Sequence, residues 1–213
     1  MNTSSNIESR FEIETRLKID TRLKWYEWNP GLHNGNLLLQ DVIDTLPAAK
    51  AEDIPWLVRL FENPASPVAF PGAINLARHD ALHVLLGRGL RNQDEAFVIG
   101  FTMGCSSHLF TWQIHSFRWI ITHLYPAPYK FNLQDLIAFD LGFGFGRTAS
   151  ARDVDEFPFE KYHHSRLKDL RYWLGINVHK LHALYRVESL LIANTQASHR
   201  LDTNDKPLPG TRH

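Results

Sequence analysis

Two histidines and two carboxylates fall within one short stretch of the chain. His79 and His83 stand four positions apart, Asp80 directly follows the first histidine, and Glu95 comes twelve positions after the second. Residues four apart on an α-helix project from the same face, so both imidazoles can converge on one ion. The pattern H-D-x-x-H, eleven residues and E therefore predicts a divalent metal site.

The ligand types indicate what such an ion would do. Two histidines and one or two carboxylates leave coordination positions open for water or substrate, which is typical of catalytic rather than structural sites. Asp80 lies about 100° round the helix from His79, so it either supplies an oxygen at the edge of the site or orients a histidine. The cofactor is predicted to be zinc or magnesium, and the sequence leaves the choice open. A histidine pair alone is more often part of a solvated or partly buried helix face, and Glu95 is what favours the metal.

The segments around these residues are predicted to be helical, because period-two alternation is scarce. A helix is predicted over residues 73–86, ended by Gly87 and Gly89. A long helix follows over residues 93–124, and the turn between the two brings Glu95 beside the histidines. Further helices are expected over residues 37–46, 53–61, 133–149 with Asn132 as its cap, 161–174 ended by Gly175, and 178–193.

This pattern predicts an all-α fold, a single-domain bundle of about seven helices with one long central helix. The 213 residues, 44% of them apolar, suffice for a sizeable core. We expect an N-terminal extension over residues 1–30, the helical domain over residues 31–193, and a disordered polar tail over residues 194–213.

The face of the long helix that carries Glu95 also predicts a pocket. At about 100° per residue it carries Thr102, Ser106, Leu109 and Gln113, with polar groups near the metal and apolar ones further along. An ordinary core face has the same composition, so both interpretations stay open. The flanks of this helix are apolar on both sides, which favours enclosure by the domain itself or by a second subunit, as in a homodimer.

Composition excludes several classes of protein. Lys and Arg equal Asp and Glu at 23 each, without the basic excess of a nucleic-acid binder. Cys105 is the only cysteine, so neither a disulfide within the chain nor a thiolate metal cluster is expected. Residues 1–10 are polar and lack the apolar run of a signal peptide. The uncharged stretch over residues 96–117 contains Ser106 and His108, which favours a buried helix over a membrane span. A cytoplasmic protein that is not secreted is predicted.

The metal motif matches a known family position for position. His79-Asp80-Ala-Leu-His83, eleven residues and Glu95 resemble the metal motif of the coenzyme Q (ubiquinone) biosynthesis protein 4 family. A second match, Gly146-Arg147-Thr-Ala149 followed by Leu170-Arg171 and Gly175-Ile176, is similar to the family's G-R-x-A and L-R-x-x-L-G-I segments. The resemblance spans roughly residues 37–176. The chain departs from the family at Asp94, where a small residue is usual, and residues 178–213 fall outside the pattern.

The resemblance implies a peripheral protein on the inner face of a membrane that binds an isoprenoid lipid, a quinone precursor or a prenyl phosphate. It implies His79, Asp80, His83 and Glu95 as metal ligands and Arg147 as a contact for the anionic head group. It also implies a role in ubiquinone biosynthesis, as a partner of the other enzymes and as a catalyst of oxidative decarboxylation of the ring.

Two alternatives remain open at this point. The chain can be a non-catalytic prenyl-lipid-binding scaffold, in which the metal only anchors the head group. It can also be a metal-dependent hydrolase, because His79-Asp80 is similar to the HD pair of phosphohydrolases. That hydrolase needs a further histidine upstream and an aspartate downstream, for which His33 and Asp140 are candidates.

Overall fold

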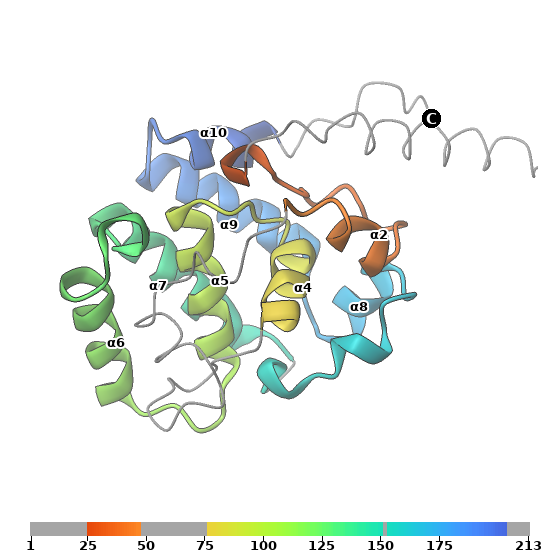
Figure 1. The fold of residues 1–213 in the computed structure, drawn as a ribbon, viewed down its shortest axis with the longest axis horizontal. Coiled ribbons are helices and arrows are strands. Elements are labelled where there is room, and N and C mark those ends of the chain that lie inside the picture. Colours follow the sequence, from red (N-terminus) through yellow and green to blue (C-terminus); the bar gives the residue numbers. More distant parts are fainter. Residues whose placement is uncertain (1–24, 48–75, 151–152, 204–213) are drawn as a thin grey trace, which may run out of the picture.

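The computed structural model describes residues 25–47, 76–150 and 153–203. In this part of the chain the secondary structure is helical, without strands, which confirms the predicted all-α class (Figure 1). An isolated β-bridge joins Leu38 and Arg166. The α-helices are α2 (Leu39–Ile43), α4 (Leu76–Leu86), α5 (Asn92–Cys105), α6 (Thr111–His123), α7 (Leu133–Thr148), α8 (Leu167–Trp173), α9 (Val178–Leu191) and α10 (Gln196–Thr203); 3-10 turns are η1 (Trp25–Glu27), η3 (Ala127–Tyr129), η4 (Val154–Glu156) and η5 (Phe159–Lys161).

Helices α5 and α7 pack against each other at very short range. A Cβ atom on Gly100 would lie 2.2 Å from the carbonyl oxygen of Phe139, and one on Gly142 would lie 2.1 Å from that of Phe97. Only glycine permits backbones to approach this closely. The glycines of both helices therefore set the distance between them and fix the rotation of α5 about its axis.

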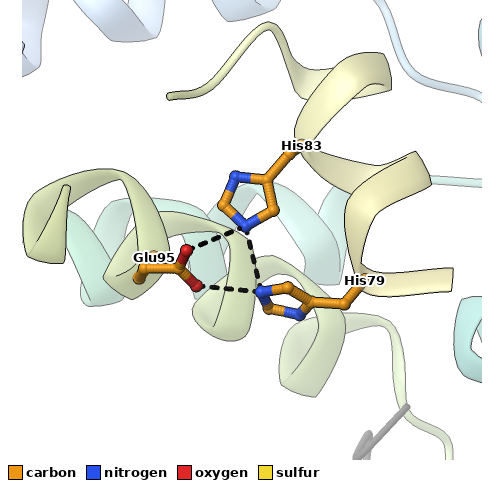
Figure 2. Close-up of side chains that lie close together, drawn as sticks. All are labelled: His79, His83 and Glu95. Atoms are coloured by element: carbon orange, nitrogen blue, oxygen red, sulfur yellow. Dashed lines mark hydrogen bonds and ion pairs between the residues drawn. The ribbon is translucent and has the colours of Figure 1, made fainter. Parts of the chain in front are cut away.

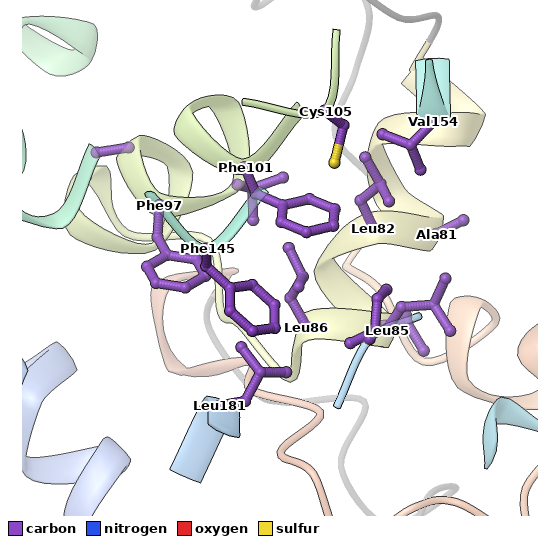
Figure 3. Packing of buried hydrophobic residues seen from close by; sticks show 14 of the residues in the cluster. Ala81, Leu82, Leu85, Leu86, Phe97, Phe101, Cys105, Phe145, Val154 and Leu181 are labelled. Carbon is purple, nitrogen blue, oxygen red and sulfur yellow. The ribbon is translucent and has the colours of Figure 1, made fainter. Parts of the chain in front are cut away.

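The hydrophobic core lies where α4, α5, α7 and α9 meet. Figure 3 shows the inner side of α4 facing the aromatic side chains of α5 and α7. A fully buried Leu or Phe stabilises the fold by about 1.5–3 kcal/mol relative to an exposed one. The buried side chains at this junction include Leu82 and Leu86 of α4, Phe97 and Phe101 of α5, Phe145 of α7 and Leu181 of α9.

The prediction of one long helix over residues 93–124 is wrong. The chain leaves α5 at Cys105 and enters α6 at Thr111, and Ser106 between them has extended backbone with φ −64° and ψ 129°. The backbone N–H and the hydroxyl of Ser107 donate to the Asp153 carboxylate, both with a shortest distance of 2.7 Å. Serine side chains compete with helical hydrogen bonding, and here the distant Asp153 stabilises the break.

The second half of the chain follows the prediction more closely. Helix α7 begins after Asn132, whose side chain accepts hydrogen bonds from the N–H groups of Gln134 and Asp135 at 2.7 and 3.0 Å. Helix α8 is shorter than the predicted 161–174, because Lys161 ends a separate 3-10 turn and Arg166 has extended backbone that pairs with Leu38. Gly175 follows α8 with a φ of 66°, as expected of a glycine that ends a helix.

The prediction of a disordered tail over residues 194–213 is wrong for its first half. Residues 196–203 form α10, which packs against α9. Ala197, Ser198 and Leu201 are buried there. Residues 1–24, most of the predicted N-terminal extension, lie outside the described residues, as do the predicted helix 53–61 and residues 204–213.

None of the helices in the described part of the chain combines the length and the apolar character needed to cross a membrane.

Candidate metal centre

Helix α4 presents both predicted histidines. Ala81, Leu82 and Leu85 fix its rotation, because their side chains are fully buried in the core. His83 is fully buried as well, whereas the His79 side chain is 18% exposed at the outer edge. The helix therefore holds one imidazole inside the protein and one at its surface.

The end of α4 is fixed by groups from α8 and α9. Arg171 donates from Nε to the carbonyl oxygen of Leu85 at 2.8 Å, and the Tyr185 hydroxyl donates to that of Leu86. These bonds satisfy carbonyls that the last turn of a helix leaves without partners. Burial lowers the pKa of Arg171 to about 10, so its guanidinium is still cationic at neutral pH.

Helix α5 supplies Glu95 from its first turn. The turn before it begins at Gly87, which has a φ of 68° and lies where a Cβ would meet the carbonyl oxygen of Gly31 at 2.7 Å. The N–H of Arg91 donates to the carboxylate of Asp94 at 3.3 Å at the start of α5. This reversal of the chain, expected from the sequence, turns Glu95 back towards α4.

The three side chains converge on one point (Figure 2). The Nε2 atoms of His79 and His83 are 2.9 Å apart. Glu95 places one carboxylate oxygen 2.8 Å from the His79 Nε2 and the other 3.3 Å from the His83 Nε2. All three residues can therefore offer a ligand atom to the same ion, with these atoms within 4.8 Å of one another.

The backbone determines which nitrogen of His83 is available. Its Nδ1 lies 2.7 Å from the carbonyl oxygen of Gly89. A carbonyl oxygen only accepts, so Nδ1 carries the hydrogen, and the neutral ring presents a lone pair at Nε2. That lone pair faces the carboxylate of Glu95, which is also an acceptor. A proton or a metal cation between them satisfies both groups.

The neighbouring histidines keep the carboxyl group of Glu95 ionised. Burial opposes ionisation of Glu95, but the neighbouring His83 and His79 outweigh it through charge and hydrogen bonding and hold the Glu95 pKa well below its usual range. A carboxylate in the first turn of α5 is also favoured by the helix dipole. Glu95 is therefore ionised across the physiological range and ready to act as a ligand.

The spacing suits a small divalent ion. Tetrahedral zinc, with bonds of about 2.0–2.1 Å, holds neighbouring ligand atoms about 3.3 Å apart. The two histidine Nε2 atoms are 2.9 Å apart, and the Glu95 oxygen that faces His79 is 2.8 Å from its Nε2, so both separations lie within about half an ångström of that value. The described residues thus supply two nitrogens and a carboxylate, and the set leaves at least one position open in a four-coordinate ion.

Asp80 stands beside this group and is not part of it. Burial raises the pKa of Asp80, the two histidines oppose the shift, and Glu95 adds to it. The carboxyl thus feels the charges of all three ligand residues. This arrangement fits the expected role at the edge of the site better than that of a primary ligand.

The predicted pocket is not assembled along one helix face, because the break at Ser106 separates its members. Thr102 is buried in α5 and donates to the carbonyl oxygen of Val98 at 2.9 Å. Gln113 lies in α6 and accepts from the N–H of Phe110 at 2.8 Å. Leu109 is half-buried in the intervening turn.

Other candidate residues lie apart from the metal ligands. Arg147 is exposed near the end of α7. The His33 ring is 5.5 Å from that of His182, and Asp140 pairs with Arg118. None of these belongs to the His79, His83 and Glu95 group, so the further ligands of an HD hydrolase are not brought together in the described part of the chain.

The sequence did not indicate the carbonyl of Gly89 as a partner of His83. The only signal in the sequence is the pair Gly87 and Gly89 soon after the histidines, which by itself predicts only the end of a helix. A backbone group has no side-chain type to reveal it, and its role emerges only from the fold.

No family model, curated protein or solved structure matches this chain. The resemblance to the coenzyme Q biosynthesis protein 4 family therefore stays a prediction that rests on the motif residues.

Proposed function

We propose that the chain binds one divalent cation through His79, His83 and Glu95, and that this ion holds the head group of a prenylated lipid, a quinone precursor or a prenyl phosphate. The observation that carries the proposal is the convergence of two Nε2 atoms and a carboxylate from two helices. When bound, the ion supplies a Lewis acid for an anionic or phenolic oxygen.

The exposure of the three ligands indicates where a head group would enter. His83 is fully buried, whereas the His79 and Glu95 side chains are 18% and 28% exposed. The open side of the site is therefore the side of His79 and Glu95. The resemblance to the family extends the proposal to oxidative decarboxylation of the ring, as a step of ubiquinone biosynthesis carried out beside its other enzymes.

Exposed aromatic side chains on α6, and on Phe110 directly before it, support the proposed peripheral contact with a membrane. Phe110, Trp112 and Trp119 are 64%, 65% and 55% exposed. Tryptophan is enriched where a protein meets the boundary between lipid and water. On α9, Val187, Leu190 and Leu191 are also exposed and provide an apolar surface for the proposed homodimer.

Native mass spectrometry with metal analysis tests this proposal. The wild-type protein is compared with His79→Ala/His83→Ala, and with His163→Ala/His164→Ala as a matched control that also loses two histidines. We expect one divalent ion and one isoprenoid lipid in the wild type and the control, with the ion lost from the first variant. Metal without lipid would favour the hydrolase, and lipid with metal but no turnover would favour the scaffold. Neither metal nor lipid would contradict the proposal.

A further inference from the structure

The turn over residues 87–91 connects the two helices that carry the proposed metal ligands. Its Gly89 carbonyl holds the Nδ1–H of His83 at 2.7 Å. Hydrogen bonds of this kind orient a histidine ligand, and their loss typically costs about 10–100-fold in metal affinity. The position of this carbonyl therefore sets the direction in which the His83 Nε2 points.

Arg88, next to that carbonyl, holds the turn in place. Its side chain is fully buried and donates to Glu188 of α9, which is fully buried too. The guanidinium lies 3.9 Å from the ring centre of Phe97 and 4.4 Å from that of Tyr185. A buried charge that loses its partner is strongly destabilising, so Arg88 and Glu188 tie the turn to α9.

The same ionic group reaches the start of α5. The Nη1 atom of Arg88 lies 3.5 Å from an oxygen of Asp94, whose other oxygen lies 3.5 Å from Arg200 of α10. Asp94 directly precedes Glu95 in the chain. This buried ionic cluster therefore includes Arg88, which directly precedes Gly89, and Asp94, which directly precedes Glu95.

Gly89 is closely packed on the side where a side chain would stand. A Cβ there would lie 2.6 Å from the carbonyl oxygen of Trp28 and 3.0 Å from both Arg200 and Asp94. The α carbon of Gly89 is therefore packed against the backbone of Trp28, the side chain of Asp94 in α5 and that of Arg200 in α10.

We propose that Arg88 and Glu188 are positioning residues for the metal centre, and that the centre is energetically coupled to the C-terminal helices α9 and α10. This inference rests on the proposed metal binding. Coupling is reciprocal, so a change at Glu188 that weakens metal binding implies that metal binding stabilises α9. The route runs from Glu188 through Arg88 to the Gly89 carbonyl and His83.

Zinc affinity, measured by competition with a chromogenic chelator, tests the positioning role. Glu188→Gln is expected to raise the zinc Kd about 10–100-fold and to alter the visible d–d absorption of the Co²⁺-substituted protein. The control Asp140→Asn breaks the exposed ion pair with Arg118 and is expected to leave both unchanged. The double variant Arg88→Met/Glu188→Met removes both charges of the buried pair at once and is expected to fold with the same loss of affinity.

Unchanged zinc affinity and an unchanged Co²⁺ spectrum in folded Glu188→Gln or in the double variant would overturn the inference. Wild-type protein that binds neither ion would instead overturn the proposed function on which the inference rests.

Hydrogen exchange on the wild-type protein tests the coupling without any substitution. Zinc is expected to slow amide exchange in α9 (Val178–Leu191) more than in α6 (Thr111–His123). An equal change in the two helices, or none in α9, would overturn the coupling.

Discussion

The two ends of the segment over residues 93–124 are held in different ways. At its start, buried polar groups surround α5: Gln93 donates to Glu188 at 2.7 Å, and Asp94 pairs with Arg88 and Arg200. Beyond Ser106, α6 leaves Trp112 and Trp119 exposed and buries only Phe117 and Ile121. Several elements enclose the start of α5, whereas α6 packs against the rest of the protein through one face.

This difference shows why the metal ligands can be predicted and the pocket cannot. His79, His83 and Glu95 are related by one helical turn and one short reversal of the chain. The predicted pocket required the same helical phase from Glu95 to Gln113, and a single break removed it. The relative positions of side chains can be predicted over one or two helical turns. Over a longer segment, a single break in the helix makes the predicted positions wrong.

The largest effect is expected where α5 meets α7. Gly142→Ala would bring a Cβ to 2.1 Å from the backbone of Phe97, so the free energy of unfolding should fall by more than about 4 kcal/mol. Gly144, in the same helix, has nothing within 4 Å of such an atom, and Gly144→Ala should stabilise by about 0.5–1 kcal/mol. Urea unfolding measures both. Equal tolerance of the two substitutions would contradict the proposed close packing.

The attachment of α6 is tested by one buried and one exposed aromatic residue. Phe117 is 1% exposed and stacks on Phe139 with ring centres 5.2 Å apart. Phe117→Ala should cost about 3 kcal/mol, whereas Trp112→Ala should change stability by less than about 0.5 kcal/mol. Thermal unfolding distinguishes them. A large loss of stability from Trp112→Ala would show that α6 is covered on its outer side as well.

The substitution Glu95→Gln tests whether the Glu95 carboxylate is a metal ligand. The amide keeps the shape of the side chain and loses the charge that attracts a cation, so zinc affinity should fall by about 100-fold, roughly 2.7 kcal/mol. Glu160→Gln, which alters an exposed carboxylate paired with Arg78, is the control and should bind zinc as the wild type does. Titration calorimetry gives both affinities. Equal affinities would remove Glu95 from the ligand set.

The smallest loss of stability is expected from the N-cap of α7, which the sequence predicts and the structure confirms. Asn132 accepts hydrogen bonds from Gln134 and Asp135 at the start of α7. Asn132→Ala should lower the free energy of unfolding by about 1 kcal/mol, and Asn132→Asp should preserve most of the capping. Chemical denaturation measures the pair, and a loss that is equal in both variants would argue against capping.

The parts that sequence reasoning missed depend on groups distant in the chain. Arg88 and Glu188 are a hundred positions apart, and nothing near either residue indicates that they meet inside the protein. The break after Cys105 has a local signal in Ser106 and Ser107, but its stabilising partner Asp153 lies far downstream. Helix α10 was missed because its strongly polar sequence resembles a disordered tail, although Leu201 is buried.

X-ray absorption at the zinc edge of the zinc-loaded protein tests whether His79, His83 and Glu95 bind the ion. We expect one ion per chain with two imidazole ligands and otherwise oxygen ligands, at bond lengths of about 2.0–2.1 Å. In His79→Ala/His83→Ala, the imidazole scattering should disappear together with stoichiometric binding. An ion with no imidazole ligand in the wild type, or with the same ligands in that variant, would contradict a metal centre at His79, His83 and Glu95.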